Sequence, residues 1–298
     1  MDPTLKSKVI TMLKAEYTGF SPRLKHVAKY ILDNPAAFGL DPIRETARKS
    51  KVSTYTLVRL ATQLGFDSFE DLREPFRHAL VSSTQFVDRP DWIDALSMHS
   101  EAGRVQAEAS MNTLAGVETA LSRLSPEMMS DVVELMLSAR TVYLTAVRSS
   151  YSMAYYFHYV GRMALPSLQL IPRHLNSPLD ELNTAGPQDV LIAITFNPYS
   201  VETIQACKFA RKKGVRLILI TDSDVVSPDL DPEVVLVAST ISTHFFACFA
   251  GAMAIIENII ALLVNRGGEK AVERIESYER LRDEFNAYWR APNKNISF

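Results

Sequence analysis

A short run of polar side chains near position 55 has the chemistry needed to read the edge of a base pair. Ser53, Thr54, Tyr55 and Thr56 carry hydroxyl groups, and Arg59 follows one helical turn later. Hydroxyls donate or accept hydrogen bonds at base edges in the major groove, and a guanidinium pairs with the two acceptors of guanine. We therefore predict that these five residues contact double-stranded DNA.

Basic side chains precede this run. Arg44, Lys49 and Lys51 lie within fifteen positions of Arg59, together with Arg48. Because phosphate contacts set the register of a protein on a duplex, we predict that Arg44, Lys49 and Lys51 bind the DNA backbone. The spacing leaves an alternative open, in which these polar residues only face water on a surface helix.

The elements that must position these side chains are two short helices joined by a tight turn. Residues 41–49 open with Asp and Pro, and residues 53–64 begin with a Ser cap and end before Gly65. One face of the pair is apolar, with Ala47, Val52, Leu57, Leu60 and Leu64. This is the layout of a helix-turn-helix, in which the first residues of the second helix enter the major groove. Neighbouring helical patterns predict an α-helical helix-turn-helix bundle over residues 1–80.

The pattern changes in the second half of the chain. Apolar, β-rich runs occur at residues 141–147, 166–172, 189–196, 215–221 and 233–239, and helical stretches at 151–164, 200–213 and 243–265 separate or follow them. Continuous apolar strands are typical of a parallel sheet that is covered on both faces. We predict a doubly wound α/β domain over residues 129–298 that ends in a charged amphipathic helix, joined to the bundle by a linker and connecting helix at 81–128.

Nine residues of the N-terminal segment fall on one pattern: Ala47, Val52, Ser53, Arg59, Leu64, Gly65, Phe66, Phe69 and Leu72. The pattern is an Ala in the first helix, a Val-Ser turn, an Arg in the second helix, then Leu-Gly-Phe and a Phe-x-x-Leu helix. It resembles the N-terminal domain of RpiR-type bacterial transcriptional regulators. The resemblance implies that the second domain is a SIS (sugar isomerase) domain, a flavodoxin-like fold that binds phosphosugars.

Two loops of the predicted sheet carry polar side chains where a ligand is expected. Ligands of doubly wound sheets bind beyond the carboxyl ends of the strands, which here are followed by residues 146–152 and 195–200. The candidate effector-binding residues are Arg148, Ser149, Ser150, Thr195, Asn197, Tyr199 and Ser200, with His174 and His244 as further residues that could line the same crevice.

These loops lack the glycines that SIS domains usually have. Ala146 and Arg148 stand in the places of a Gly-x-Gly-x-Ser motif, and Pro198 replaces the glycine of the second loop. Glycine lets backbone N–H groups approach a phosphate closely, so we predict that the Arg148 guanidinium binds the anion instead. The alternative is that Arg148 pairs with an internal carboxylate and that the pocket binds no ligand.

Charge, cysteine spacing and the first residues limit the functional classes that remain. Residues 1–80 carry 13 Lys and Arg against 9 Asp and Glu, whereas the 298-residue chain has a net charge of −2, which favours a nucleic-acid-binding front end on an acidic body. Cys207 and Cys248 have no metal-ligand spacing, and the first residues lack the apolar core of a signal peptide. We expect a cytoplasmic protein with reduced thiols, no metal site and no cofactor.

The sequence thus predicts a homodimeric or homotetrameric regulator that binds operator DNA and senses a small, sugar-derived and anionic metabolite, without a membrane partner. No clustered acid and base stands out, so we expect no enzymatic activity. Three alternatives remain: a sugar-phosphate isomerase, an assembly protein, and a regulator whose pocket no longer binds an effector.

Overall fold

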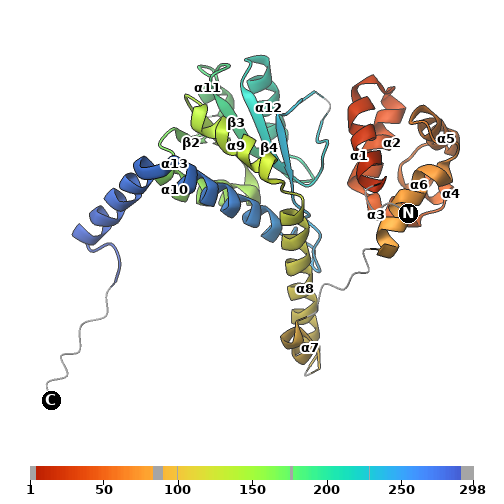
Figure 1. The fold of residues 1–298 in the computed structure, drawn as a ribbon, viewed down its shortest axis with the longest axis horizontal. Helices are drawn as coiled ribbons and strands as arrows, with labels where there is room; N and C mark the ends of the chain where they lie inside the picture. Colours follow the sequence, from red (N-terminus) through yellow and green to blue (C-terminus); the bar gives the residue numbers. More distant parts are fainter. Residues whose placement is uncertain (1–4, 83–89, 99, 175–176, 228, 290–298) are drawn as a thin grey trace. The chain divides into compact units, whose positions relative to one another are not determined.

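The computed structural model describes residues 5–82, 90–98, 100–174, 177–227 and 229–289. Its first part is a bundle of short helices (Figure 1). The bounds are α1 Leu5–Glu16, α2 Pro22–Asp33, α3 Pro35–Leu40, α4 Ile43–Lys49, α5 Thr54–Gln63 and α6 Phe69–Ser82. The predicted helix-turn-helix is therefore present as α4 and α5. Helices α1 and α3 were not predicted. Helix α3 follows α2 at once, because Asn34 ends α2 and Pro35 begins α3.

The bundle encloses one apolar core. Leu13, Val27, Ile31 and Leu60 are fully buried in it. Phe38 joins α3 to α6, since its ring lies edge-on to Phe69 at 5.5 Å and to Phe76 at 5.0 Å between centroids. Such edge-to-face pairs add to the stability that burial alone provides. The core fixes α5 against α2 and α6, and so determines which face of α5 remains in water.

Helices α7 (Asp91–Ser97) and α8 (Glu101–Ser122) follow, packed against each other. A polar stretch that we expected to be linker thus contains a helix. Gly103 makes the close approach possible, because a Cβ at this position would meet the Leu96 carbonyl oxygen at 2.2 Å. The Ser100 hydroxyl caps α8 by accepting the Gly103 N–H at 3.0 Å.

The α/β part contains a five-stranded sheet with helices beside it (Figure 1). The strands are β1 Val142–Thr145, β2 Leu168–Ile171, β3 Val190–Ile194, β4 Arg216–Thr221 and β5 Val234–Val237, in the order β2-β1-β3-β4-β5. The helices are α9 Pro126–Ser138, α10 Tyr151–Ala164, α11 Pro178–Leu182, α12 Val201–Lys212 and α13 Ala250–Glu284. This is the predicted doubly wound, flavodoxin-like topology.

Strand burial explains why the sequence runs are continuously apolar. Every residue of β1 and of β3 is buried, so both faces of these strands are covered. They pair in parallel, with Val142 opposite Val190 and Thr145 opposite Ala193. The chain leaves β1 toward β2 on one side and returns to β3 on the other. The order therefore reverses between β1 and β3, where ligands of such sheets bind.

The last helices differ from the prediction. Residues 243–249 are not helical, and α13 begins only at Ala250. The predicted long helix and the predicted C-terminal helix are two helices within α13 that meet at Gly268, whose backbone is not helical and whose φ is 57°. Glycine adopts this left-handed conformation without the strain that a Cβ would cause.

Contacts divide the chain into two compact units. The first contains residues 1–123, 221–231 and 235–252, and the second contains residues 124–220, 232–234 and 253–298. The first unit thus adds two segments of the second half of the chain to helices α1 to α8.

Candidate nucleic-acid interface and effector site

The turn between α4 and α5 is closed by backbone hydrogen bonds and a side-chain cap. The Val52 N–H donates to the Ala47 carbonyl at 3.0 Å, and Lys51 takes a positive φ of 52°. Ser53 then caps α5, its hydroxyl accepting the Thr56 N–H at 3.3 Å. The geometry places the first turn of α5 immediately after the turn, as a helix-turn-helix requires.

The inner face of α5 is confirmed as apolar. Leu57, Leu60 and Leu64 are buried against the bundle, as is Ala47 of α4. Val52 is half-buried and packs on the same core. Burial of this face fixes the rotation of α5 about its own axis.

The outer face carries most of the predicted reading residues. Ser53, Thr54 and Arg59 are exposed, and Tyr55 is 73% exposed. Thr56 is different, because it is buried and its hydroxyl lies 2.9 Å from the Ser53 hydroxyl. Thr56 therefore belongs to the cap and does not share the exposed face of Thr54 and Tyr55.

The cations that are predicted to bind DNA fall into two groups. Arg44, Lys51 and Arg59 are exposed and form no ion pair within the described residues. Lys49 instead binds the Asp41 carboxylate at 2.8 Å, and this hydrogen bond raises the pKa of Lys49. Lys49 must exchange Asp41 for a phosphate to act as predicted, whereas the other three need not exchange a partner.

The first effector loop keeps an unusual backbone shape. Arg148 has a φ of 56° and begins a 3-10 turn, residues 148–150, that leads into α10. The left-handed region is the one that glycine favours, so the loop keeps a glycine-like conformation with an arginine in place. The side chains of Arg148 and Ser149 are exposed, whereas Ser150 is buried.

The second effector loop follows β3, the neighbour of β1. Thr195 is buried, and its N–H donates to the Ile220 carbonyl of β4 at 3.1 Å. Asn197 is exposed, and Tyr199 and Ser200 are half-buried just ahead of α12. The Ser200 hydroxyl makes no capping bond to α12. Both loops leave the carboxyl ends of adjacent strands, because Thr145 and Ala193 are in register.

The two histidines are placed separately. His174 is exposed after β2, next to Arg173, which binds the Glu181 carboxylate at 2.6 Å. His244 lies in the first unit on the segment between β5 and α13, and its Nδ1 accepts the Phe246 N–H at 3.2 Å. The role of both histidines in effector binding stays a prediction.

The two cysteines lie in different environments. Cys207 is buried in α12, and burial raises the pKa of its thiol to about 12, so it stays protonated. Cys248 is half-buried and unpaired. Across the described ranges, no cluster of three His, Cys, Asp or Glu side chains could hold a metal ion.

Helix α13 is long and apolar enough, by length and composition alone, to cross a membrane. One such helix is weak support for a span, because core helices of water-soluble proteins have the same composition. Its residues Ala252, Ile255, Ile256 and Ile259 are fully buried within the protein. Their burial fits a core helix.

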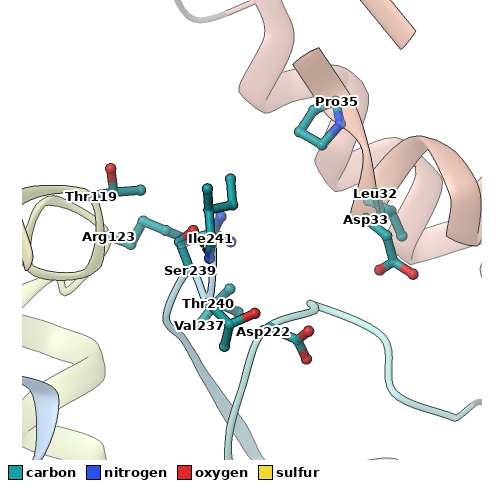
Figure 2. A pocket seen from close by; sticks show the side chains of 10 residues that line it. All are labelled: Leu32, Asp33, Pro35, Thr119, Arg123, Asp222, Val237, Ser239, Thr240 and Ile241. Carbon is teal, nitrogen blue, oxygen red and sulfur yellow. Dashed lines mark hydrogen bonds between the residues drawn. The ribbon is translucent and has the colours of Figure 1, made fainter. Parts of the chain in front are cut away.

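Sequence reasoning missed a polar cluster in the first unit. The segments after β4 and β5 contribute Asp222 and residues 239–241 to a hollow of about 210 Å³, which Asp33 of α2 and Arg123 beyond α8 also line (Figure 2). Beside it, the Asp224 side chain binds Lys14 at 2.7 Å and Arg123 at 2.8 Å. These residues lie far apart in the sequence and belong to no motif, so no spacing indicated them.

Comparisons with known proteins agree with both parts of this description. Residues 7–83 match the helix-turn-helix domain of the rpiR family, and residues 135–238 match the SIS domain. An uncharacterized HTH-type transcriptional regulator of Providencia stuartii is 23% identical over 218 residues, which are 73% of this chain and 74% of that protein.

Two solved structures share the fold. The sugar isomerase domain of an RpiR transcription factor from Sphaerobacter thermophilus covers 59% of this chain and 99% of its own, with 21% identity and a TM-score of 0.55. The NanR protein of Vibrio vulnificus, complexed with ManNAc-6P, covers 93% of this chain and 98% of its own, with 18% identity and a TM-score of 0.54. The chain therefore belongs to the RpiR-type transcriptional regulators, with an rpiR-family helix-turn-helix domain followed by a SIS domain.

Proposed function

We propose that this regulator reads a DNA operator with the outer face of α5 and alters its DNA binding when a small, sugar-derived anion occupies the loops after β1 and β3. The DNA-binding part rests on the observation that α5 has one buried apolar face and one exposed polar face. Leu57 and Leu60 are buried on one side, while Tyr55 and Arg59 are exposed on the other with no ion pair to Arg59 in the described structure. A reading helix needs both properties.

Two of the cations that are predicted to bind phosphate are free to do so. Arg44 and Lys51 flank the reading face without competing carboxylates among the described residues. Release of counterions from phosphates that these cations neutralise would supply the sequence-independent part of the affinity. Thr54, Tyr55 and Arg59 would supply the choice of sequence.

The effector proposal rests on the reversal of strand order between β1 and β3. Arg148 and Asn197 are exposed on the two loops that leave this point. A guanidinium binds phosphate or carboxylate in two-point fashion. The V. vulnificus NanR structure contains ManNAc-6P, and a phosphorylated or acidic sugar is the effector class that an exposed Arg148 would favour here.

We further propose that the protein acts as a cytoplasmic homo-oligomer. Two reading helices related by a two-fold axis would bind half-sites one helical turn apart. An effector that prefers one arrangement of the subunits would shift the separation of these helices and thereby change the operator affinity.

The DNA-binding part is tested by selecting duplexes from a random-sequence pool with the purified full-length protein. We expect one enriched motif, and we expect Arg59→Ala to weaken binding to it by about 1–3 kcal/mol. Thr62→Ala on the same helix is the control, because the Thr62 hydroxyl donates to its own backbone at Val58. Failure to enrich any sequence at low salt would refute the DNA-binding part.

The effector part is tested by a thermal-shift screen of the full-length protein against sugar phosphates, sugar acids and neutral polyols. Anionic compounds should stabilise the wild type and not Arg148→Ala, whereas Arg162→Ala, at the other end of α10, should respond like the wild type. Stabilisation by neutral polyols alone would contradict an anionic effector. Turnover of a stabilising sugar phosphate would favour the isomerase alternative.

A further inference from the structure

Four residues directly after β4 are bound by helices α1, α2 and the end of α8. We call residues 222–225 the β4 clasp. The carboxylate of Asp224 accepts hydrogen bonds from Lys14 at 2.7 Å and from Arg123 at 2.8 Å to each of its oxygens. The Asp224 side chain is only 9% exposed, although both partners reach it from the surface.

Helix α2 binds the same four residues at a second point. The Lys29 ammonium donates to the Val225 carbonyl at 2.6 Å and pairs with Asp33 at 2.9 Å. The Ser223 hydroxyl donates to the Asp33 carboxylate. The Val225 side chain also packs against the apolar core of the helical bundle. The bundle that carries α5 is therefore held at the β4 clasp by two charged clusters and one apolar contact within the first unit.

The ion pairs and hydrogen bonds between the β4 clasp and the bundle can break and form again together. Burying a carboxylate costs free energy unless it is paired, so Asp224 is stable at this position only with its two cations. If the bundle moves away, Lys14 leaves the Asp224 carboxylate, which then keeps only Arg123, the residue that follows α8, as its cation. Two states, clasped and released, then differ by a few charge-assisted hydrogen bonds and the contact of Val225 with the bundle core.

The β4 clasp directly follows β4 in the sequence. Strand β4 pairs with β3, and one of the two proposed effector loops follows β3. Ile194, the last residue of β3, is in register with Ile220 of β4, and the Ile220 carbonyl accepts the N–H of Thr195. Thr195 begins the loop after β3. Only three residues separate Ile220 from Asp224, so a shift of that loop has a short covalent and hydrogen-bonded route to the clasp.

We propose that the β4 clasp is a regulatory latch. It holds the DNA-binding bundle in one arrangement that leaves the outer face of α5 open, and its release frees the bundle and lowers affinity for paired half-sites. The effect on DNA rests on the proposed function. The existence of the latch does not depend on the proposed function, because its contacts form within the protein without DNA or effector.

Hydrogen–deuterium exchange of the full-length protein tests the latch without DNA. Asp224→Asn removes the negative charge, and Lys14→Met removes one cation from a residue that is 41% exposed and therefore tolerant of substitution. In both variants, peptides covering residues 221–231 and α1 should exchange about ten-fold faster, the factor expected for losing a charge-assisted hydrogen bond. Peptides covering α5 should exchange as in the wild type.

Matched controls separate the latch from a general effect of charge. Asp131→Asn, on the exposed side of α9, repeats the first change, and Lys25→Met on α2 repeats the second; neither side chain forms an ion pair or a hydrogen bond among the described residues. Both controls should exchange like the wild type. Wild-type protection at residues 221–231 and α1 in folded Lys14→Met would overturn the proposal, even if Asp224→Asn does not fold.

Binding to the selected duplex gives the regulatory readout. Lys14→Met should lose affinity for a duplex with two half-sites more than Lys25→Met does, and the two should bind a single half-site equally. Equal losses on both duplexes would contradict regulation by the latch. If the wild type selects no duplex, the proposed function fails, while the exchange result still decides whether the latch exists.

Discussion

The Ser53 hydroxyl accepts the backbone N–H of Thr56 at 3.3 Å, and the two hydroxyls of these residues lie 2.9 Å apart. The pair closes the first turn of α5 and turns Thr56 toward the protein. As a consequence, Thr54 and Tyr55 are left on the exposed side. One cap thus fixes both the start of the helix and the side chains that it presents.

Replacing the cap should destabilise the bundle. We expect Ser53→Ala to lower the free energy of unfolding by about 1 kcal/mol, since the Thr56 N–H loses its side-chain acceptor. Urea unfolding measures the change. Ser53→Asp keeps an acceptor and should stay near the wild type; an equal loss in both variants would show that the cap is not the cause.

Arg59 can be tested for the kind of DNA contact it makes. Arg59→Lys keeps the charge but loses the two-point geometry of the guanidinium. If Arg59 contacts a guanine, this variant should lose about 1–3 kcal/mol on the selected duplex and relax the preference at one base pair, with little change on random DNA. Fluorescence anisotropy on both duplexes measures this. A uniform loss on both would assign Arg59 to a phosphate.

The left-handed backbone at Arg148 predicts an unusual order of stabilities. Any residue with a Cβ is strained at a φ of 56° by about 1–2 kcal/mol, whereas glycine is not. Glycine gains some entropy in the unfolded chain, so Arg148→Gly should exceed Arg148→Ala in unfolding free energy by about 1 kcal/mol. Denaturant unfolding of the two variants provides the comparison. Both should lose the thermal-shift response to anions, because both lack the guanidinium.

Packing of the inner face of α5 predicts a large loss at Leu60, which is fully buried. Leu60→Ala should cost about 2–5 kcal/mol, because it removes apolar contacts and leaves a cavity. Leu40→Ala provides the same chemical change at a side chain that is 68% exposed and should cost far less. Similar losses at the two positions, measured by urea unfolding, would contradict the described rotation of α5.

Asp224 predicts a dependence of stability on pH. Burial favours its neutral form, but Arg123 and Lys14 outweigh burial and hold the pKa of Asp224 below its ordinary value. A lowered folded pKa means that the stabilisation is fully present above the ordinary carboxyl pKa of about 4 and is lost as pH falls through the folded value. The wild type should therefore exceed Asp224→Asn in unfolding free energy at pH 7 by more than at pH 3. A difference that does not shrink on acidification would exclude the charge as its source.

The helices and strands that could be predicted are those whose caps, apolar pattern and end signals all lie within the segment itself. Helix α5 was found because its Ser cap, its apolar face and the following Gly65 are all local. The strands were found because parallel strands that are covered on both faces are apolar throughout. Helix α3 was missed because Asn34 and Pro35 end one helix and begin the next, and the stop signal was read without the start.

The candidate sites were predictable only as far as neighbouring residues determine them. The hydroxyl run of α5 was visible, but the inward turn of Thr56 depends on its bond to Ser53 and on packing. The loss of glycine at Arg148 was visible, whereas the retained left-handed backbone was not, because side-chain identity does not report φ. The Asp224 cluster joins residues from three distant segments, which no local pattern can bring together.

The kink at Gly268 has a consequence for the end of the chain. Nothing lies within 4 Å of the place where a Cβ would stand, so the bend at Gly268 leaves open space beside its backbone. Beyond it the helix is held on α10, because the Arg274 side chain donates to the Ala164 carbonyl and Arg282 lies beside Met163, while Leu281 and Phe285 remain exposed.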